Sequence, residues 1–278
     1  MGNFAPGTGS KTRSMTSTAR ILIIAGSDSS GGAGIQADIK TIAMLGGHPM
    51  TAITAITAQN TVTVTDVLEL PTALIRAQVD AVVSDLGVQA AKTGMLSSAA
   101  IIEAVALAVE AHRIVNLVVD PVMVAKGGAR LLRDDAVDAL RARLLPLAAV
   151  LTPNLPEAEV LLGRPVATLE ERRRAARELG ALGPRTVVVK GGHADGDAID
   201  VVWDGQALVE LAAPRQATAN THGSGCTFSA AIAAHLARGD SAADAVRRAK
   251  EFITHAIEFS IEVGRGHGPV NPMYRLRQ

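Results

Sequence analysis

Residues 21–39, ILIIAGSDSSGGAGIQADI, place an apolar run, a glycine-rich loop and the start of a helical pattern in immediate succession. The run Ile21–Ala25 contains no polar side chain, which predicts a strand buried on both faces of a sheet. Beyond the glycines, Ile35, Ile39 and Ile42 recur at helical spacing. A buried strand that leads through a tight loop into a helix is the repeating unit of parallel α/β folds.

Apolar strands and helical segments continue to alternate along the chain. We expect further strands at 62–70, 88–93, 117–120, 149–151 and 186–190, helices at 71–86, 98–112, 134–145, 155–162, 169–179, 225–238 and 240–263, and a hairpin of 199–203 with 208–211. This alternation predicts an α/β fold with a mostly parallel sheet, helices on both faces and ligands at the carboxyl ends of the strands. Residues 21–278 are expected to form one domain. Residues 1–20 are expected to be a disordered tail, with either Met1 or Met15 as the native start.

The composition excludes several classes of function. Apolar residues make up 48% of the chain, which supports a large core rather than a disordered chain. The formal net charge is zero and 2% of residues are aromatic, so neither a basic surface nor a base-stacking platform for nucleic acid is expected. Charged residues interrupt the longest apolar stretches, so no membrane span is expected. Cys226 is the only cysteine, which excludes an intrachain disulfide and a multi-thiolate metal site.

A second glycine-rich segment, Thr221-His222-Gly223-Ser224-Gly225-Cys226, leads directly into an apolar helical pattern. The first backbone N–H groups of a helix have no partner within it, and glycines let an anion approach them, so this segment predicts a phosphate-binding site. Cys226 falls in the first turn, where the helix dipole favours a thiolate. The alternative is a small buried cysteine at the start of a core helix; the neighbouring Thr221 and His222 favour the anion site.

Other candidate polar residues follow predicted strands. Asp120 ends a buried strand, where a carboxylate could hold Mg²⁺ or simply terminate the strand. Asn154 and Glu157 form a capping-box pattern, which is compatible with a Glu157 that also reaches a metal ion through water. Lys190 ends a strand of three valines, where an ammonium group is useful near phosphates, although most lysines are only solvated. The amide of Gln59 matches the donor–acceptor edge of an aminopyrimidine, with a polar loop residue as the alternative.

The first glycine loop also allows a dinucleotide-binding interpretation, because Gly32-Ala33-Gly34-Ile35-Gln36-Ala37 fits the relaxed fingerprint. That fingerprint requires an acidic residue about twenty positions later, to hold a ribose. The chain has no Asp or Glu between Asp38 and Asp66. A dinucleotide oxidoreductase is therefore disfavoured, and a tight structural turn is the alternative to a ligand-binding loop.

The order of these motifs resembles that of the bacterial hydroxymethylpyrimidine/phosphomethylpyrimidine kinases of the ribokinase superfamily. The resemblance extends from Ile21 to Pro269 and rests on Gly26-Ser27-Asp28, Gly31-Gly32-Ala33-Gly34-Ile35-Gln36-Ala37-Asp38, Ala58-Gln59-Asn60, Lys92-Thr93-Gly94-Met95-Leu96, Asp120-Pro121-Val122-Met123, Thr152-Pro153-Asn154-Leu155-Pro156-Glu157, Lys190-Gly191-Gly192-His193 and Thr221–Cys226. It implies a ribokinase-like three-layer sandwich with a small β flap. It also implies that ATP phosphorylates 4-amino-5-hydroxymethyl-2-methylpyrimidine, and then its monophosphate to the diphosphate, in thiamine biosynthesis.

The resemblance implies roles for particular residues on the pyrimidine side. Gln59 is expected to pair with the aminopyrimidine edge, and Asp38 is expected to reach a polar group of the substrate. Three residues are expected to enclose the ring, namely Gly26, Met95 and Val122.

On the nucleotide side, the resemblance implies that Asn154, Glu157 and Lys190 lie near ATP. Asp120 and Glu157 are expected near Mg²⁺. Four residues are expected to form an anion hole, namely Gly223, Ser224, Gly225 and Cys226. The resemblance also implies a homodimer that acts in the cytoplasm.

Cys226 stands where ribokinase-like sugar kinases typically have an Asp general base, and cysteine there is usual in the pyrimidine kinases and some related pyridoxal kinases. Because phosphoryl transfer depends mostly on positioning and charge stabilisation, a very strong base is not required. The mechanistic hypothesis is in-line attack of the hydroxymethyl oxygen on the γ-phosphate, with Cys226 accepting the proton. A pyridoxal kinase is the alternative kinase, which Gln59 and Met95 disfavour. A non-catalytic binder of a vitamin precursor is disfavoured by the charged residues on the nucleotide side.

Overall fold

The computed structural model describes residues 18–125, 127–133, 135–192 and 197–277 of the 278-residue chain. Most of the expected tail, Asp134 at the start of an expected helix, and His193 lie outside the described residues. Arg20, which we assigned to the tail, already belongs to the first strand.

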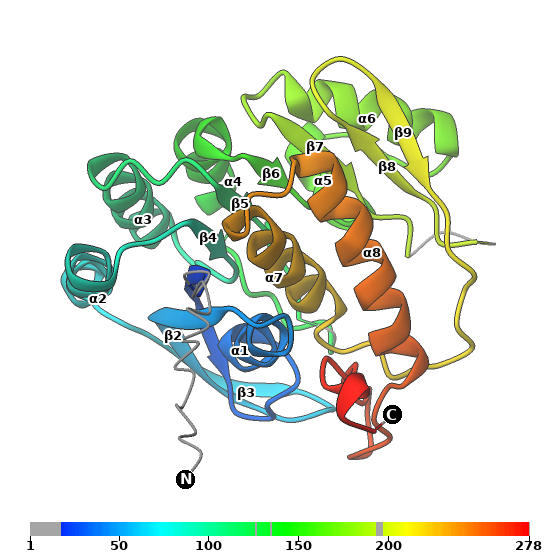
Figure 1. Ribbon diagram of the computed structural model, residues 1–278, viewed down its shortest axis with the longest axis horizontal. Coiled ribbons are helices and arrows are strands. Elements are labelled where there is room, and N and C mark those ends of the chain that lie inside the picture. The colour runs from blue at the N-terminus through cyan, green and yellow to red at the C-terminus, as the bar shows by residue number, and fades with distance from the viewer. Residues whose placement is uncertain (1–17, 126, 134, 193–196, 278) are drawn as a thin grey trace, which may run out of the picture.

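Within the described residues, the sheet has nine strands in the order β3-β2-β1-β4-β5-β6-β7-β8-β9 (Figure 1). The strands are β1 (Arg20–Asp28), β2 (His48–Gln59), β3 (Val64–Glu69), β4 (Ala90–Thr93), β5 (Leu117–Val119), β6 (Val150–Leu151), β7 (Thr186–Val189), β8 (Asp200–Trp203) and β9 (Leu208–Leu211). The strands from β2 to β7 in that order are parallel, whereas β3 at one edge and β8 and β9 at the other are antiparallel. The predicted mostly parallel sheet and the hairpin are confirmed.

Helices cover both faces of the sheet, which gives three layers (Figure 1). One face carries α1 (Gly34–Met44), α7 (Ser224–Ala237) and α8 (Ala242–Glu258). The other face carries α2 (Thr72–Leu86), α3 (Ala99–Ala111), α4 (Ala136–Ala139), α5 (Leu155–Leu162) and α6 (Leu169–Gly180). No helix in this described part of the chain combines the length and apolar character needed to cross a bilayer.

The strand β1 shows why a sequence without polar positions forms the centre of such a sandwich. Leu22 and Ile24 pack into the core under α2 and α3, whereas Ile21, Ile23 and Ala25 pack into the core under α1 and α7. Every one of these side chains is fully buried. Because alternate side chains of a strand point to opposite faces, a strand between two helical layers needs apolar residues at every position.

Two expected helices differ from those observed. The segment expected as one helix over 134–145 consists of α4, a π-helical turn at Leu140–Leu144 and a 3₁₀ turn at Leu145–Leu147. Pro146 lies in that last turn; without an N–H, it cannot continue the α-helical hydrogen-bond pattern. The last long helix ends at Glu258 rather than Val263. The chain closes with a 3₁₀ turn at Tyr274–Arg277.

The small flap predicted from the resemblance is the edge of the sheet formed by the end of β2 and by β3. β2 continues to Gln59, so its last residues pair with β3 and carry Gln59 to the carboxyl edge of the sheet. The glycine loop after β1 and the start of α7 reach the same edge. The fold therefore gathers the two glycine-rich segments and Gln59 at one place.

Candidate active site

A cavity of about 740 Å³ runs along the carboxyl ends of the central strands. Its walls come from the loop after β1, the end of β2, the loops after β4, β5 and β7, and the first turns of α5 and α7. All but one of the residues that the sequence proposed for the site line it, namely Gly26, Gln59, Met95, Asp120, Val122, Asn154, Glu157, Lys190, Gly223, Ser224, Gly225 and Cys226. The exception is Asp38. These residues therefore lie around one cavity, but the role of each of them stays a prediction.

At the start of α7 the backbone comes very close to the loop after β1. Gly223 is the N-cap of α7 and has a left-handed conformation, with φ of 76°. A Cβ at this position would collide with the backbone oxygen of Gly32. Gly223 thus meets both requirements that glycine alone satisfies well, a positive φ and a close backbone approach. Anion binding by this turn stays a prediction; the structure shows only why a glycine stands at position 223.

A group of buried charges faces this turn. The Lys190 Nζ atom lies 3.1 Å from Asp120 Oδ1 and 3.9 Å from Glu157 Oε2. A Cβ built on Gly225 would lie 3.4 Å from the same Nζ atom. Burial alone would raise the pKa of Asp120, but the ammonium groups of Lys190 and Lys92 hold that pKa below its usual value. Asp120 is therefore an ionised carboxylate next to the anion-binding turn.

Asn154 and Glu157 form the capping box that the sequence predicts at the start of α5. The Glu157 N–H donates to Asn154 Oδ1 at 2.9 Å, and the Asn154 N–H donates to Glu157 Oε2 at 2.8 Å. Burial raises the pKa of Glu157 to about 7; Lys190 opposes this rise, and the carboxylate of Asp120 adds to it. One carboxylate oxygen of Glu157 is thus used within the helix start, while the side chain still lines the cavity.

The structure does not bring Asp38 to the cavity, so its predicted contact with the substrate stays a prediction without support from this geometry. The Asp38 side chain has no exposed surface and does not line the cavity. Its two carboxylate oxygens lie 3.1 and 2.9 Å from the Nζ atom of Lys92, which is also fully buried. Burial acts to lower the pKa of Lys92, but the Asp38 carboxylate outweighs it and keeps the ammonium group protonated. Asp38 sits beneath the cavity as the partner of Lys92, because Ala37 and Asp38 belong to the face of α1 that packs on the sheet.

The expectation that the helix start favours a Cys226 thiolate is not met either. The side chain is partly accessible from the cavity. Burial raises the pKa of the Cys226 thiol to about 12; the ammonium of Lys92 opposes this rise, and the carboxylates of Asp38 and Asp120 add to it. Loss of solvation and two nearby negative charges therefore outweigh the helix dipole. Cys226 is a neutral thiol in the ligand-free protein.

The thiol's protonation state gives a direct prediction. Because only the thiolate reacts, the rate of Cys226 alkylation by iodoacetamide should rise about tenfold per pH unit from pH 7 to pH 9, without levelling off. The chain has a single cysteine, so mass spectrometry of the intact protein reports on Cys226 alone. A rate that is already constant at pH 7 would show that the helix start does hold a thiolate.

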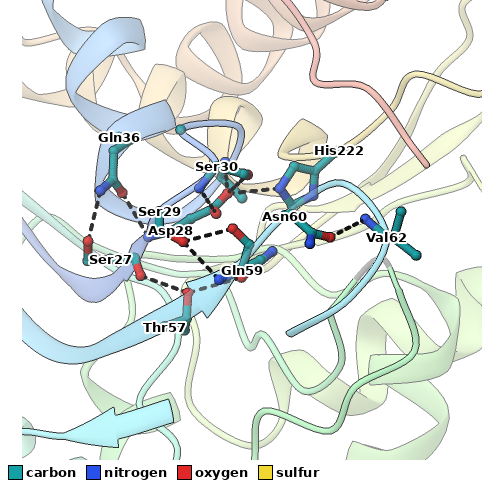
Figure 2. Close-up of polar contacts among 12 residues, drawn as sticks. Ser27, Asp28, Ser29, Ser30, Gln36, Thr57, Gln59, Asn60, Val62 and His222 are labelled. Atoms are coloured by element: carbon teal, nitrogen blue, oxygen red, sulfur yellow. Dashed lines mark hydrogen bonds and ion pairs between the residues drawn. The ribbon is translucent and has the colours of Figure 1, made fainter. Parts of the chain in front are cut away.

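The side of the cavity that is expected to hold the pyrimidine is built around the end of β1 (Figure 2). A Cβ on Gly26 would lie 2.7 Å from Met95 Cε, so a larger residue there would displace the end of the Met95 side chain. The Thr57 hydroxyl lies 3.2 Å from Gln59 Oε1, and the Ser29 hydroxyl donates to the Gln59 backbone oxygen at 2.7 Å. Gln59 is therefore held by its backbone, and its amide oxygen has a neighbour that can orient it.

Several cavity residues escaped the sequence interpretation. Lys250 on α8 lies 2.8 Å from Asp200 Oδ2 on β8, and the Gly191 N–H donates to Asp200 Oδ1 at 2.8 Å. Both Lys250 and Asp200 line the cavity. In the sequence, Lys250 falls in an amphipathic helix and Asp200 in a hairpin strand, so each resembles an ordinary structural residue. The lone signal was Gly191-Gly192 after Lys190, which indicates that a backbone or ligand approaches closely there.

Comparison with known proteins agrees with this geometry. The family model described as phosphomethylpyrimidine kinase matches residues 28–271. The chain is 49% identical over 261 residues to the hydroxymethylpyrimidine/phosphomethylpyrimidine kinase of Mycobacterium tuberculosis, covering 92% of this chain and 94% of that protein. It is 51% identical over 252 residues to a bifunctional thiamine biosynthesis protein of Geobacter sulfurreducens, covering 90% of this chain and 51% of that longer protein. The chain thus spans about half the length of this second relative.

A solved structure gives the same fold. The ADP complex of Bacillus subtilis pyridoxal kinase superposes with a TM-score of 0.88 at 43% identity, covering 94% of this chain and 99% of that one. This likeness confirms the ribokinase-like sandwich expected from the sequence. The family model covers most of the chain, and the pyrimidine kinase relative is matched over nearly its full length. The chain therefore belongs to the phosphomethylpyrimidine kinase family.

Proposed function

We propose that the cavity transfers the γ-phosphoryl group of ATP to the hydroxymethyl oxygen of 4-amino-5-hydroxymethyl-2-methylpyrimidine, and then a second phosphoryl group to the monophosphate, in thiamine biosynthesis. One observation carries this proposal. A single cavity joins an amide-bearing pocket at Gln59 to the anion-binding start of α7, and the Asp120–Lys190 pair faces that helix start. An alcohol placed at the first site and a nucleotide placed along the second would meet at Gly223–Cys226.

The chemistry needs little covalent help from the protein. The hydroxymethyl oxygen forms a bond to the γ-phosphorus, the bond to the β–γ bridging oxygen breaks, and ADP leaves with that electron pair. Backbone N–H groups at the start of α7 stabilise the charge on the transferring group. The alcohol proton is lost late, and we propose Cys226 as its acceptor. Since the thiol is neutral in the ligand-free protein, Cys226 must first release its own proton to water in the cavity, a step that the Lys92 ammonium favours and the Asp38 and Asp120 carboxylates oppose.

A Cys226→Ala variant tests the role as proton acceptor. We expect kcat to fall about tenfold. This is less than the loss of about a hundred-fold or more that is typical of removing a general base, because phosphoryl transfer depends mainly on positioning. Steady-state kinetics with saturating ATP measure this directly. Turnover close to that of the unchanged protein would refute the base role while leaving the anion-binding role intact.

The carboxylates on the nucleotide side fit a magnesium ion that is shared with phosphate. The described residues hold no group of three His, Cys, Asp or Glu side chains that could bind a metal by themselves. Mg²⁺ in kinases is usually held by one or two carboxylates together with phosphate oxygens and water. Asp120 and Glu157, both lining the cavity next to Lys190, would supply those carboxylates. When bound, the ion neutralises phosphate charge, while Lys190 and the start of α7 orient the nucleotide.

The proposal is tested by pyrimidine-dependent formation of ADP. We expect Mg²⁺-dependent ADP production with the hydroxymethylpyrimidine and, separately, with its monophosphate. ADP formation that requires neither pyrimidine would contradict the proposal, as would binding of the pyrimidine without turnover, which would indicate a vitamin-precursor binder. The same assay with pyridoxal tests the alternative function, a pyridoxal kinase. The likeness to Bacillus subtilis pyridoxal kinase is the observation that favours this alternative. Efficient pyridoxal turnover without pyrimidine turnover would reverse the choice.

We also propose that the chain acts as a homodimer in the cytoplasm, where ATP is available. In support, Ile56 on β2 and Leu68 on β3 are directly paired across the edge of the sheet, and 47% and 64% of their surfaces are exposed. A neighbouring copy that covers this edge would remove apolar surface from water. Light scattering should therefore give twice the chain mass, and Leu68→Glu should shift the protein toward the monomer. A monomeric unchanged protein would contradict this proposal.

A further inference from the structure

The carboxylate of Asp28 accepts several of the hydrogen bonds drawn in Figure 2, among them one from His222. Its Oδ1 atom accepts the Ser30 N–H at 2.8 Å. Its Oδ2 atom accepts the Ser30 hydroxyl at 2.9 Å, the Ala33 N–H at 2.8 Å and the His222 Nε2–H at 2.9 Å. An ionised carboxylate only accepts hydrogen bonds, so the His222 proton on this side is carried by Nε2. Burial acts to raise the pKa of Asp28, but these hydrogen bonds, His222 first, hold it below its usual value.

His222 connects this carboxylate to the start of α7. Its backbone N–H donates to the Gly268 oxygen at 3.1 Å, and its backbone oxygen accepts the Val270 N–H at 3.0 Å. The next residue is Gly223, the N-cap of α7, which lies against the backbone oxygen of Gly32. A Cβ on Gly32 would collide with the His222 ring. The loop after β1 and the start of α7 therefore touch at two points, one polar and one made by close backbone approach.

The same loop also touches the pyrimidine side. The Ser29 hydroxyl accepts the Gln59 N–H at 2.8 Å and donates to the Gln59 oxygen at 2.7 Å. Ser29 follows Asp28 directly in the chain. A continuous set of short contacts thus runs from Gln59 through Ser29 and Asp28 to His222, and from there to Gly223.

From these contacts we propose that Asp28 and His222 form a positioning pair. During phosphoryl transfer the pair fixes the anion-binding start of α7 relative to the loop between β1 and α1, called here the pyrimidine-binding loop because its Ser29 contacts Gln59. The inference rests on the proposed kinase function. Neither residue is assigned a bond-making or proton-transfer step. The pair acts because the transferring phosphoryl group must meet both the substrate oxygen and the helix N–H groups, and a displacement of about 1 Å between reacting groups can cost about a hundred-fold in rate.

The chain contains a matched control on the same helix. His235 lies near the other end of α7, where its Nδ1 atom is 3.0 Å from Asp240 Oδ2, and its side chain is 8% exposed against 7% for His222. His235 does not line the cavity. Loss of either pair removes a His–Asp contact at one end of α7, with Asp240 23% exposed against 4% for Asp28. Only loss of the Asp28–His222 pair changes the junction with the pyrimidine-binding loop.

The test compares four single variants by steady-state kinetics with the hydroxymethylpyrimidine and ATP, well below each variant's unfolding midpoint. We expect His222→Leu and Asp28→Asn to lower kcat about 10- to 100-fold while the KM for ATP changes less than about threefold. His222→Gln keeps an amide N–H near the position of Nε2 and should restore kcat to within about threefold of the unchanged protein. His235→Leu should lose thermal stability but keep kcat.

A double variant makes the test specific to the pair. If the two side chains act through each other, Asp28→Asn combined with His222→Leu should lower kcat no further than the more damaging single change. Equal kcat losses in His222→Leu and His235→Leu, or additive losses in the double variant, would overturn the inference by showing only a general loosening of α7. If the unchanged protein shows no pyrimidine-dependent turnover, the proposed function fails and this inference fails with it. If the unchanged protein is active and the variants keep their kcat, the inference alone fails.

Discussion

Replacing Gly223 with alanine should lower kcat about a hundred-fold or more, the effect typical of losing a donor that stabilises transition-state charge. The added Cβ would collide with the backbone oxygen of Gly32, and the φ of 76° disfavours any residue with a Cβ. The start of α7 must then move, and its N–H groups no longer point to the transferring phosphoryl group. Single-turnover measurement of phosphoryl transfer reports this loss directly.

Gly239 provides the control for backbone strain. It follows α7 at the other end, has φ of 92° and has no atom within 4 Å of an added Cβ. Gly239→Ala should therefore cost about 1 kcal/mol of stability through the positive φ while leaving kcat unchanged. A Gly223→Ala variant with kcat near that of Gly239→Ala would remove the start of α7 from the transfer step.

The second large effect is on stability. Lys92→Met should lower the free energy of unfolding by about 3–5 kcal/mol, because it leaves the fully buried Asp38 carboxylate without its partner. Both side chains have no exposed surface, and Lys92 Nζ makes two contacts with the carboxylate. Urea unfolding followed by circular dichroism measures the loss.

Two further variants define what this loss means. Arg247→Met removes exposed ion pairs with Asp244 and Glu251 and should leave the free energy of unfolding nearly unchanged. Adding Asp38→Leu to Lys92→Met should recover much of the stability, because no buried charge then remains. A loss below 1 kcal/mol for Lys92→Met alone would mean that water or a rearrangement reaches Asp38.

The layers of the fold were predictable because the main signal is periodicity. Ile21–Ala25 has the unbroken apolar run of a strand between two helical layers, and both of its faces are buried as expected. Predictions from hydrogen bonds between residues close in sequence were also confirmed, as for the capping box of Asn154 and Glu157. The segment expected as a helix over 134–145 is helical from Ala136, but its π-helical turn at Leu140–Leu144 was not predicted, because such a turn has no signal in helical spacing.

The sequence predicted which residues lie at the site better than it predicted the surroundings of each charged group. The resemblance and the strand-end rule placed Gln59, Asp120 and Lys190 at one edge, and they do line one cavity. The environment of each group depends on contacts that are distant in sequence. Lys92 pairs with Asp38 across 54 positions, which removes Asp38 from the cavity. Burial, together with the carboxylates of Asp38 and Asp120, raises the pKa of Cys226 despite the Lys92 ammonium, against the helix dipole that the sequence alone shows.

The most direct test of the central claim is a crystal structure of the protein with the hydroxymethylpyrimidine and a non-hydrolysable ATP analogue. We predict that the terminal phosphate lies about 3 Å from backbone nitrogens at the start of α7, and that the aminopyrimidine edge faces the Gln59 amide. The hydroxymethyl oxygen should then lie in line with the γ-phosphorus beside Cys226. A phosphate chain bound away from Gly223–Cys226, or a pyrimidine bound away from Gln59, would contradict the claim that this cavity performs the transfer.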